Sequence, residues 1–144
     1  MSDIATDKFK DAVKRAVERW RSKLEAPAKQ LVKLDSEISG LEARKPASDD
    51  DKKKLVEAMK AYAALRKQIE TANDELRVDL MLLDPPAKTA ANEKELLKLP
   101  EFIKEIIKSK GVPLGKGVSI APDVKFDFKA LKLKDVGIKV TWRF

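Results

Sequence analysis

Residues 13–41, VKRAVERWRSKLEAPAKQLVKLDSEISGL, carry an apolar residue at every seventh position and a second apolar set four residues further on. Seven residues make about two turns of an α-helix, so both sets lie along one side of one long helix. Most positions between them are charged, as is typical of the solvated side of such a helix. The members of this seam are Val13, Val17, Trp20, Leu24, Pro27, Leu31, Leu34, Ile38 and Leu41.

Pro27 interrupts the seam. Proline has no N–H, and its ring clashes with the carbonyl of the residue four positions earlier. We therefore expect either a kink at Pro27 or a break, in which case a new helix begins at Ala26 and Pro27.

A second helix is predicted after a polar turn. Ser48 followed by three aspartates at 49–51 matches an N-cap and an acidic first turn. Asp84, Pro85 and Pro86 end the pattern, because neither proline continues the hydrogen-bond ladder. Residues 1–86 thus predict an antiparallel helical hairpin. The second seam consists of Leu55, Ala58, Tyr62, Leu65, Ile69, Ala72, Leu76 and Leu83.

Residues 87–111 predict a short third helical segment. Asn92 is a candidate N-cap, and Gly111 is a candidate C′ residue after two lysines. Pro100 suits the first turn of a helix, so the segment is either one helix or two short helices that meet at Leu99 and Pro100.

The periodicity changes from helical to alternating in residues 112–144. Apolar residues alternate with polar ones in 118–128 and again in 138–144, and the phase slips between these runs. We expect a bulge or bend near Lys129 and Ala130, and a turn at 134–137 that makes a hairpin. Two or three strands are not stable alone, so their apolar face must pack on the helices or on a partner.

The predicted fold class is therefore α+β and mostly α: a long antiparallel, coiled-coil-like helical hairpin, a short third helix and a small C-terminal antiparallel sheet. The segments 1–86, 87–111 and 112–144 are expected to form one cooperative domain. A chain of 144 residues with 43% hydrophobic residues can bury a sufficient core without disulfides.

The composition excludes several kinds of chemistry. The chain has no His and no Cys, and therefore no imidazole base, thiol nucleophile or cysteine metal site. No carboxylate pair stands in an apolar setting that would suit acid–base catalysis. We predict a protein that is not an enzyme, with no catalytic residue, no metal site and no cofactor.

The first residues are polar and lack the basic and apolar regions of a secretory signal, so we expect synthesis in the cytosol. Export by a route that does not read such a signal stays open. Association with a membrane is not expected, because no apolar stretch has the length of a spanning helix.

The net charge of +7 suggests polyanions as one class of partner. The interleaved acids favour the alternative, an ordinary solvated helix face. The basic candidates are Lys14, Arg15, Arg19, Arg21 and Lys23 around Trp20, and Lys125, Lys129, Lys132, Lys134, Lys139 and Arg143 near the C-terminus.

The favoured function is protein–protein interaction in an assembly, as an adaptor or structural component, with a phage or an injection machine as the suggested setting. The last strand is expected to add to a partner's sheet, and a second copy of the chain is an open alternative as partner. A toxin or effector that acts on a membrane or a target protein is the second hypothesis, and a nucleic-acid-binding protein is the third. The interaction candidates are Ile138, Val140, Trp142, Phe144, Lys139 and Arg143.

Overall fold

The computed structural model describes residues 4–44, 48–114, 118–127 and 132–142. These contain three helices and a two-stranded antiparallel sheet, which confirms the predicted α+β, mostly helical fold. The elements are α1 (Ile4–Ala43), α2 (Asp49–Met81), α3 (Glu93–Lys110), β1 (Ser119–Asp127) and β2 (Lys132–Thr141).

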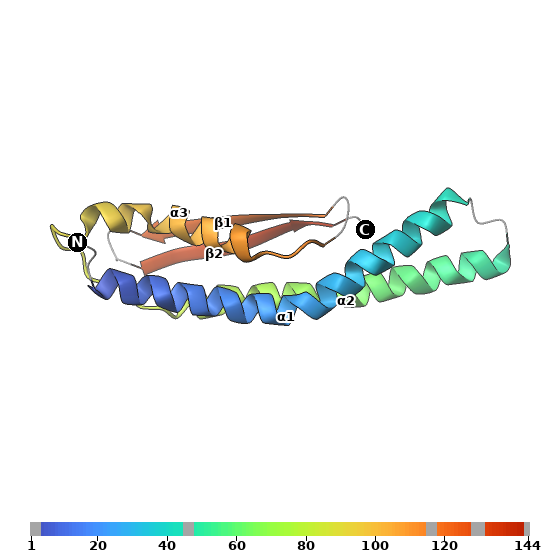
Figure 1. Ribbon diagram of the computed structural model, residues 1–144, viewed down its shortest axis with the longest axis horizontal. Helices are drawn as coiled ribbons and strands as arrows, with labels where there is room; N and C mark the ends of the chain where they lie inside the picture. Colours follow the sequence, from blue (N-terminus) through green and yellow to red (C-terminus); the bar gives the residue numbers. More distant parts are fainter. Residues whose placement is uncertain (1–3, 45–47, 115–117, 128–131, 143–144) are drawn as a thin grey trace.

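α1 runs without interruption through Pro27, so the predicted break and new helix are wrong and the kink alternative remains. Figure 1 shows the second half of α1 turned away from the direction of the first. The missing N–H and the ring clash account for such a bend. Leu24, Ala28 and Leu31 are buried on either side of Pro27, and this packing holds the helix together across it.

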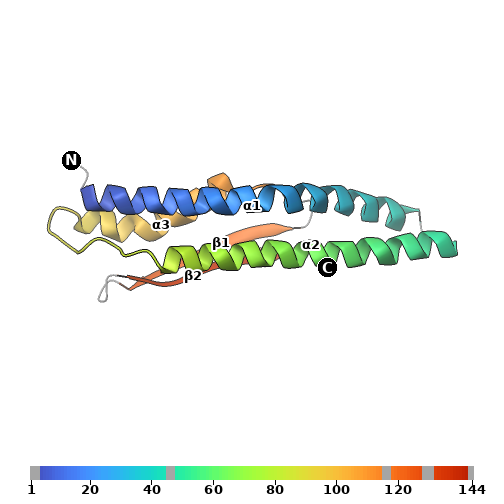
Figure 2. The ribbon, with the colours of Figure 1, turned by 90° about the horizontal axis from the view of Figure 1, so that it is seen from below.

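α1 and α2 pack as the predicted antiparallel hairpin (Figure 2). Arg19 Nη2 lies 3.9 Å from Asp79 Oδ2, and one turn later Lys23 pairs with Glu75. The two basic residues advance along α1 while their acidic partners step back along α2, as an antiparallel register requires. Most members of both apolar seams are buried beside this charged border, and Leu34, Leu55 and Leu83 are partly buried.

The ends of α2 follow the sequence signals. The Oγ of Ser48 accepts a hydrogen bond from the backbone N–H of Asp51 at 3.1 Å, which confirms the predicted N-cap. The helix ends at Met81, before the two prolines, so the seam position Leu83 lies beyond it.

α3 is one continuous helix through Pro100, so the alternative of two short helices is wrong. Its apolar side packs on α1 and β1, and this packing compensates for the hydrogen bond that proline omits. Asn92 precedes α3 without a side-chain cap, because its amide instead donates to the Ala87 carbonyl and its Oδ1 accepts from the Thr89 N–H. Gly111 is extended, not left-handed.

The sheet corrects two sequence predictions. Residues 134–137 lie inside β2 and are not a turn, and the two strands are instead joined by residues 128–131, which lie outside the described part of the chain. Lys129 and Ala130, where a bulge or bend is expected from the sequence, lie outside the described residues. The register shifts between Lys125 and Phe126, opposite the extra residue Lys134.

This irregularity explains the change of phase. Leu133 and Val136 are three residues apart and both buried, which regular alternation forbids. Because Lys134 is an extra residue in β2, the alternation shifts by one position there, and both side chains face the core.

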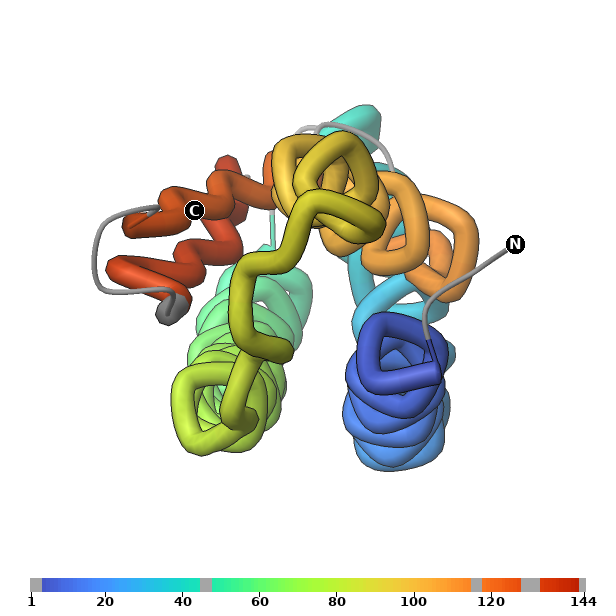
Figure 3. The backbone as a smooth tube through the Cα atoms, turned by 90° about the vertical axis from the view of Figure 1, so that its left-hand side faces the viewer, coloured from blue at the N-terminus to red at the C-terminus, as the bar shows by residue number. Residues whose placement is uncertain are grey.

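The molecule has two layers. Figures 1 and 3 show α1 and α2 side by side, covered along part of their length by α3 and the sheet. α3 contacts α1 and β1, and α2 contacts β2. The far end of the hairpin extends beyond this second layer as an uncovered arm (Figure 2).

Candidate functional site

The predicted interaction strand uses its apolar side chains within the chain itself. Ile138, Val140 and Trp142 are half-buried against the helical layer. The Trp142 ring meets Tyr62 edge-on, with 6.5 Å between ring centroids, and the Arg66 guanidinium lies 5.2 Å from the Trp142 centroid.

The other members of that set lie elsewhere. Lys139 is exposed on the opposite face of the sheet and pairs in register with Ala121. Arg143 and Phe144 lie outside the described residues. The apolar row of β2 is therefore a packing surface, and a partner reaching this strand would meet its edge first.

A groove of about 300 Å³ lies between β2 and α2, and we name it the β2 groove. No described residue of β1 lines it, so it belongs to the side of β2 that faces away from β1. In the end-on view of Figure 3, no other helix or strand among the described elements stands beyond the sheet on its outer side. The lining residues are Arg66, Glu70, Asn73, Asp74, Ile138, Val140 and Trp142.

A stripe of α2 residues contributes Arg66, Glu70 and Asp74 to the helical wall of this groove and continues beyond it. Residues spaced by three or four positions share one side of a helix, and Arg66, Glu70, Asp74, Arg77 and Met81 have this spacing. We call these five residues the α2 flank.

Two contacts tie the flank to β2 and to Trp142, which follows it. The Arg66 guanidinium lies over the Trp142 ring, and further along the flank Arg77 Nη2 lies 3.3 Å from Asp135 Oδ1. Arg66 Nε also pairs with Glu70 Oε1 at 2.9 Å. The flank thus runs beside the edge of β2 that no described strand pairs with, and its acidic residues Glu70 and Asp74 lie between Arg66 and Arg77.

The flank also has an exposed apolar end. Met81 retains 37% of its accessible surface and the neighbouring Val78 retains 54%. They are two of several exposed apolar side chains in the described part of the chain.

Three of the five basic residues of the predicted polyanion cluster on α1 form ion pairs with acids. Arg19 and Lys23 pair with Asp79 and Glu75 across the hairpin, and Arg21 Nε lies 3.3 Å from Glu25 Oε1. Lys14 and Arg15 are exposed on α1.

The Trp20 ring at the centre of that cluster is only 2% exposed and is part of the core, so it offers no stacking platform for bases.

The C-terminal basic residues are mixed with acids. Lys125 is in register with Asp135, and Lys134 and Lys139 are exposed on β2. Lys132 is the first residue of β2, whereas Lys129 lies outside the described residues.

Within the part of the chain that the structure describes, no group of three or more acidic side chains is placed to hold a metal ion. None of the described helices combines the length and apolarity needed to cross a membrane.

The sequence reasoning missed the α2 flank. Its alternating charges resemble any solvated helix face, and its relation to β2 depends on contacts between residues 58 positions apart, such as Arg77 and Asp135. The only hint in the sequence was that Val78 and Met81 are apolar residues outside the second seam.

No family model matches the chain, and neither a curated protein nor a solved structure matches it.

Proposed function

We propose that this protein is a non-enzymatic interaction module that binds a partner protein by accepting an extended segment as a third strand on the unpaired edge of β2. The observation that carries the proposal is a strand of 10 residues paired on one side and bordered on the other by the β2 groove. Backbone groups on such an edge are available for strand addition, which supplies affinity through main-chain hydrogen bonds.

Pro122 indicates which β2 residues face the partner. Pro122 is in register with Ile138, and a proline fits where the missing N–H would point away from the neighbouring strand. The pair is then a non-hydrogen-bonded one, and in an antiparallel ladder the bonding direction alternates. Ile138 and Val140 therefore direct their N–H and C=O groups to the free edge.

The usable edge is limited to one part of β2. The bulge at Lys134 disrupts the ladder, and exposed lysines on edge strands discourage indiscriminate pairing. We expect the partner strand to pair along residues 135–141, beyond the bulge.

The charged and apolar residues of the α2 flank indicate which side chains the partner strand carries. Alternate residues of that strand would face α2, where Glu70 and Asp74 favour a lysine or arginine in the middle of the segment. Met81 and Val78 favour an apolar residue at the end near Asp135. The proposed partner motif is an alternating strand with one central basic residue.

A photo-crosslinking amino acid at Asp74 tests the location of the partner in cells that contain it. Glu57 is the matched control, because it is an exposed acid on the same helix but lines a different hollow, beside the last turns of α1. The proposal predicts a crosslinked protein from position 74 and a much weaker product from 57. Equal products from both positions, or a product from 57 alone, would contradict it.

A further inference from the structure

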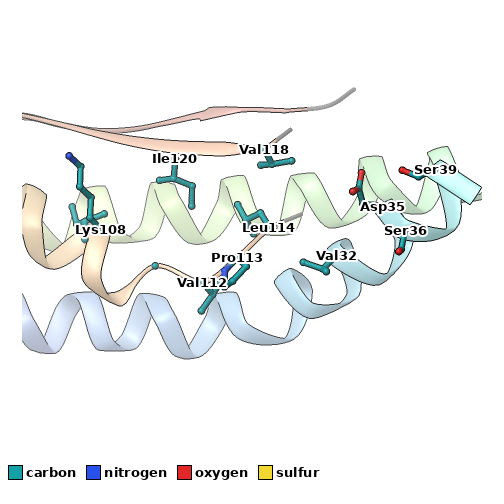
Figure 4. Close-up of a pocket in the computed structure, with 12 residues that line it drawn as sticks. Val32, Asp35, Ser36, Ser39, Lys108, Val112, Pro113, Leu114, Val118 and Ile120 are labelled. Atoms are coloured by element: carbon teal, nitrogen blue, oxygen red, sulfur yellow. The ribbon is translucent and has the colours of Figure 1, made fainter. Parts of the chain in front are cut away.

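A hollow bordered by both layers lies away from the β2 groove, where the end of α3, the segment 111–114 and the start of β1 face the bent part of α1 (Figure 4). Its volume is about 660 Å³, within the usual range of small-molecule sites. We name it the junction cleft. Its lining includes Val32, Asp35, Ser36 and Ser39 of α1, Ile107, Lys108, Gly111, Val112, Pro113 and Leu114 after or within α3, and Val118 and Ile120 at β1.

Most of the wall of the junction cleft is aliphatic. Val32, Leu114 and Val118 lie around its centre in Figure 4, and Ile120 extends the same wall along β1. Lys108 contributes its methylene chain, and its ammonium group points away from the other labelled residues. An apolar body bound here would lose contact with water on several sides.

One end of the cleft is polar. Asp35 and Ser39 are one helical turn apart on α1, and Figure 4 shows their side chains at the same end of the cleft, with Ser36 next to them. Asp35 is only 4% exposed, which is uncommon for an aspartate. The carboxylate accepts hydrogen bonds only, and the serine hydroxyls can both donate and accept.

We propose that the junction cleft binds a small organic cation, with a primary ammonium group at the Asp35–Ser39 end and an aliphatic body against Val32, Leu114 and Val118. Charge complementarity selects the cation, because the negative charge of Asp35 attracts an ammonium group and repels a carboxylate ligand. Lys108 is the sole basic residue among the described residues of the lining, and its charged end is directed elsewhere.

Three probes of equal chain length separate charge from hydrophobicity: hexylammonium, hexanol and hexanoate. Methyl resonances of Val32, Leu114, Val118 and Ile120 in the intact protein report binding. The proposal predicts that hexylammonium shifts these resonances and binds about tenfold or more tightly than hexanol, with hexanoate weakest, since a charge-assisted hydrogen bond discriminates on this scale. Equal affinities for the three probes, or no shift with hexylammonium at millimolar concentration, would overturn it.

Two variants locate the interaction. Asp35→Asn should reduce hexylammonium affinity to that of hexanol while hexanol binding persists. Val32→Lys places a like charge at the rim and, because Val32 is 38% exposed, should fold; it should weaken hexylammonium about tenfold. Val56→Lys is the control, since Val56 is an exposed valine that does not line the cleft. Equal effects of the two lysines, or undiminished binding by Asp35→Asn, would contradict the assignment.

Discussion

The indole Nε1 of Trp20 on α1 donates a hydrogen bond of 2.8 Å to the Oδ1 of Asn73 on α2, and both side chains are buried. This bond fixes how α1 and α2 are aligned along their lengths, because the seam residues around it are apolar and specify no single alignment. A buried polar pair of this kind is specific, because any other register leaves an N–H or a C=O without a partner.

Replacing Asn73 by Leu should lower the free energy of unfolding by about 1–3 kcal/mol, because the indole N–H is left buried and unsatisfied. Trp20→Phe removes the donor, so adding Asn73→Leu to Trp20→Phe should cost less than adding it to the wild-type chain. Urea denaturation of the four proteins measures this coupling. Strictly additive effects would show that the bond does not contribute to stability.

Ser48→Ala should lower the free energy of unfolding by about 1 kcal/mol, because the first turn of α2 loses the acceptor for the Asp51 N–H. Ser22→Ala is the matched control. The Ser22 Oγ donates to the Glu18 carbonyl within the middle of α1, so its loss should be close to neutral. Thermal unfolding compares the two, and an equal loss of stability in both variants would contradict the capping assignment.

Val136→Ala should cost about 2 kcal/mol of unfolding free energy, because Val136 is fully buried within β2. If residues 134–137 formed an exposed turn, this substitution would be nearly neutral. Lys139→Ala, at an exposed position of the same strand, should change stability little. Urea denaturation distinguishes the two placements of 134–137.

The helices were predictable because their apolar seams are long and periodic. The residues that form these seams are also the ones that pack in the core, so the pattern and the packing agree. Breaks at Pro27 and Pro100 stayed open as alternatives because the sequence shows the local cost of a proline but not the burial around it. Leu24 and Leu31 near Pro27, and Leu99 and Ile103 near Pro100, bury enough apolar surface to maintain both helices.

The sequence predicted an antiparallel sheet, but it placed the turn between the strands at the wrong residues. Lys134, Asp135 and Gly137 have the composition of a turn, and only the burial of Leu133 and Val136 shows that they are part of a strand. The β2 groove could not be derived from sequence, because it depends on Arg66 reaching Trp142 and Arg77 reaching Asp135 across the fold.

Val140→Pro should abolish partner binding by strand addition while leaving the fold intact, because it removes an N–H that faces the free edge and Pro122 shows that the sheet tolerates proline. Lys139→Pro is the comparison, since its N–H is expected to bond to β1. That variant should unfold at lower urea concentration than Val140→Pro. Partner binding retained by a folded Val140→Pro protein would count against strand addition.

Amide hydrogen exchange in β2 tests the central claim most directly. In the free protein, the Ile138 and Val140 amides should exchange much faster than those of Lys139 and Thr141, which bond to β1. In the complex with the partner crosslinked at position 74, Ile138 and Val140 should become as protected as their neighbours. If their exchange rates are the same in the free protein and in the complex, the edge of β2 does not accept a strand.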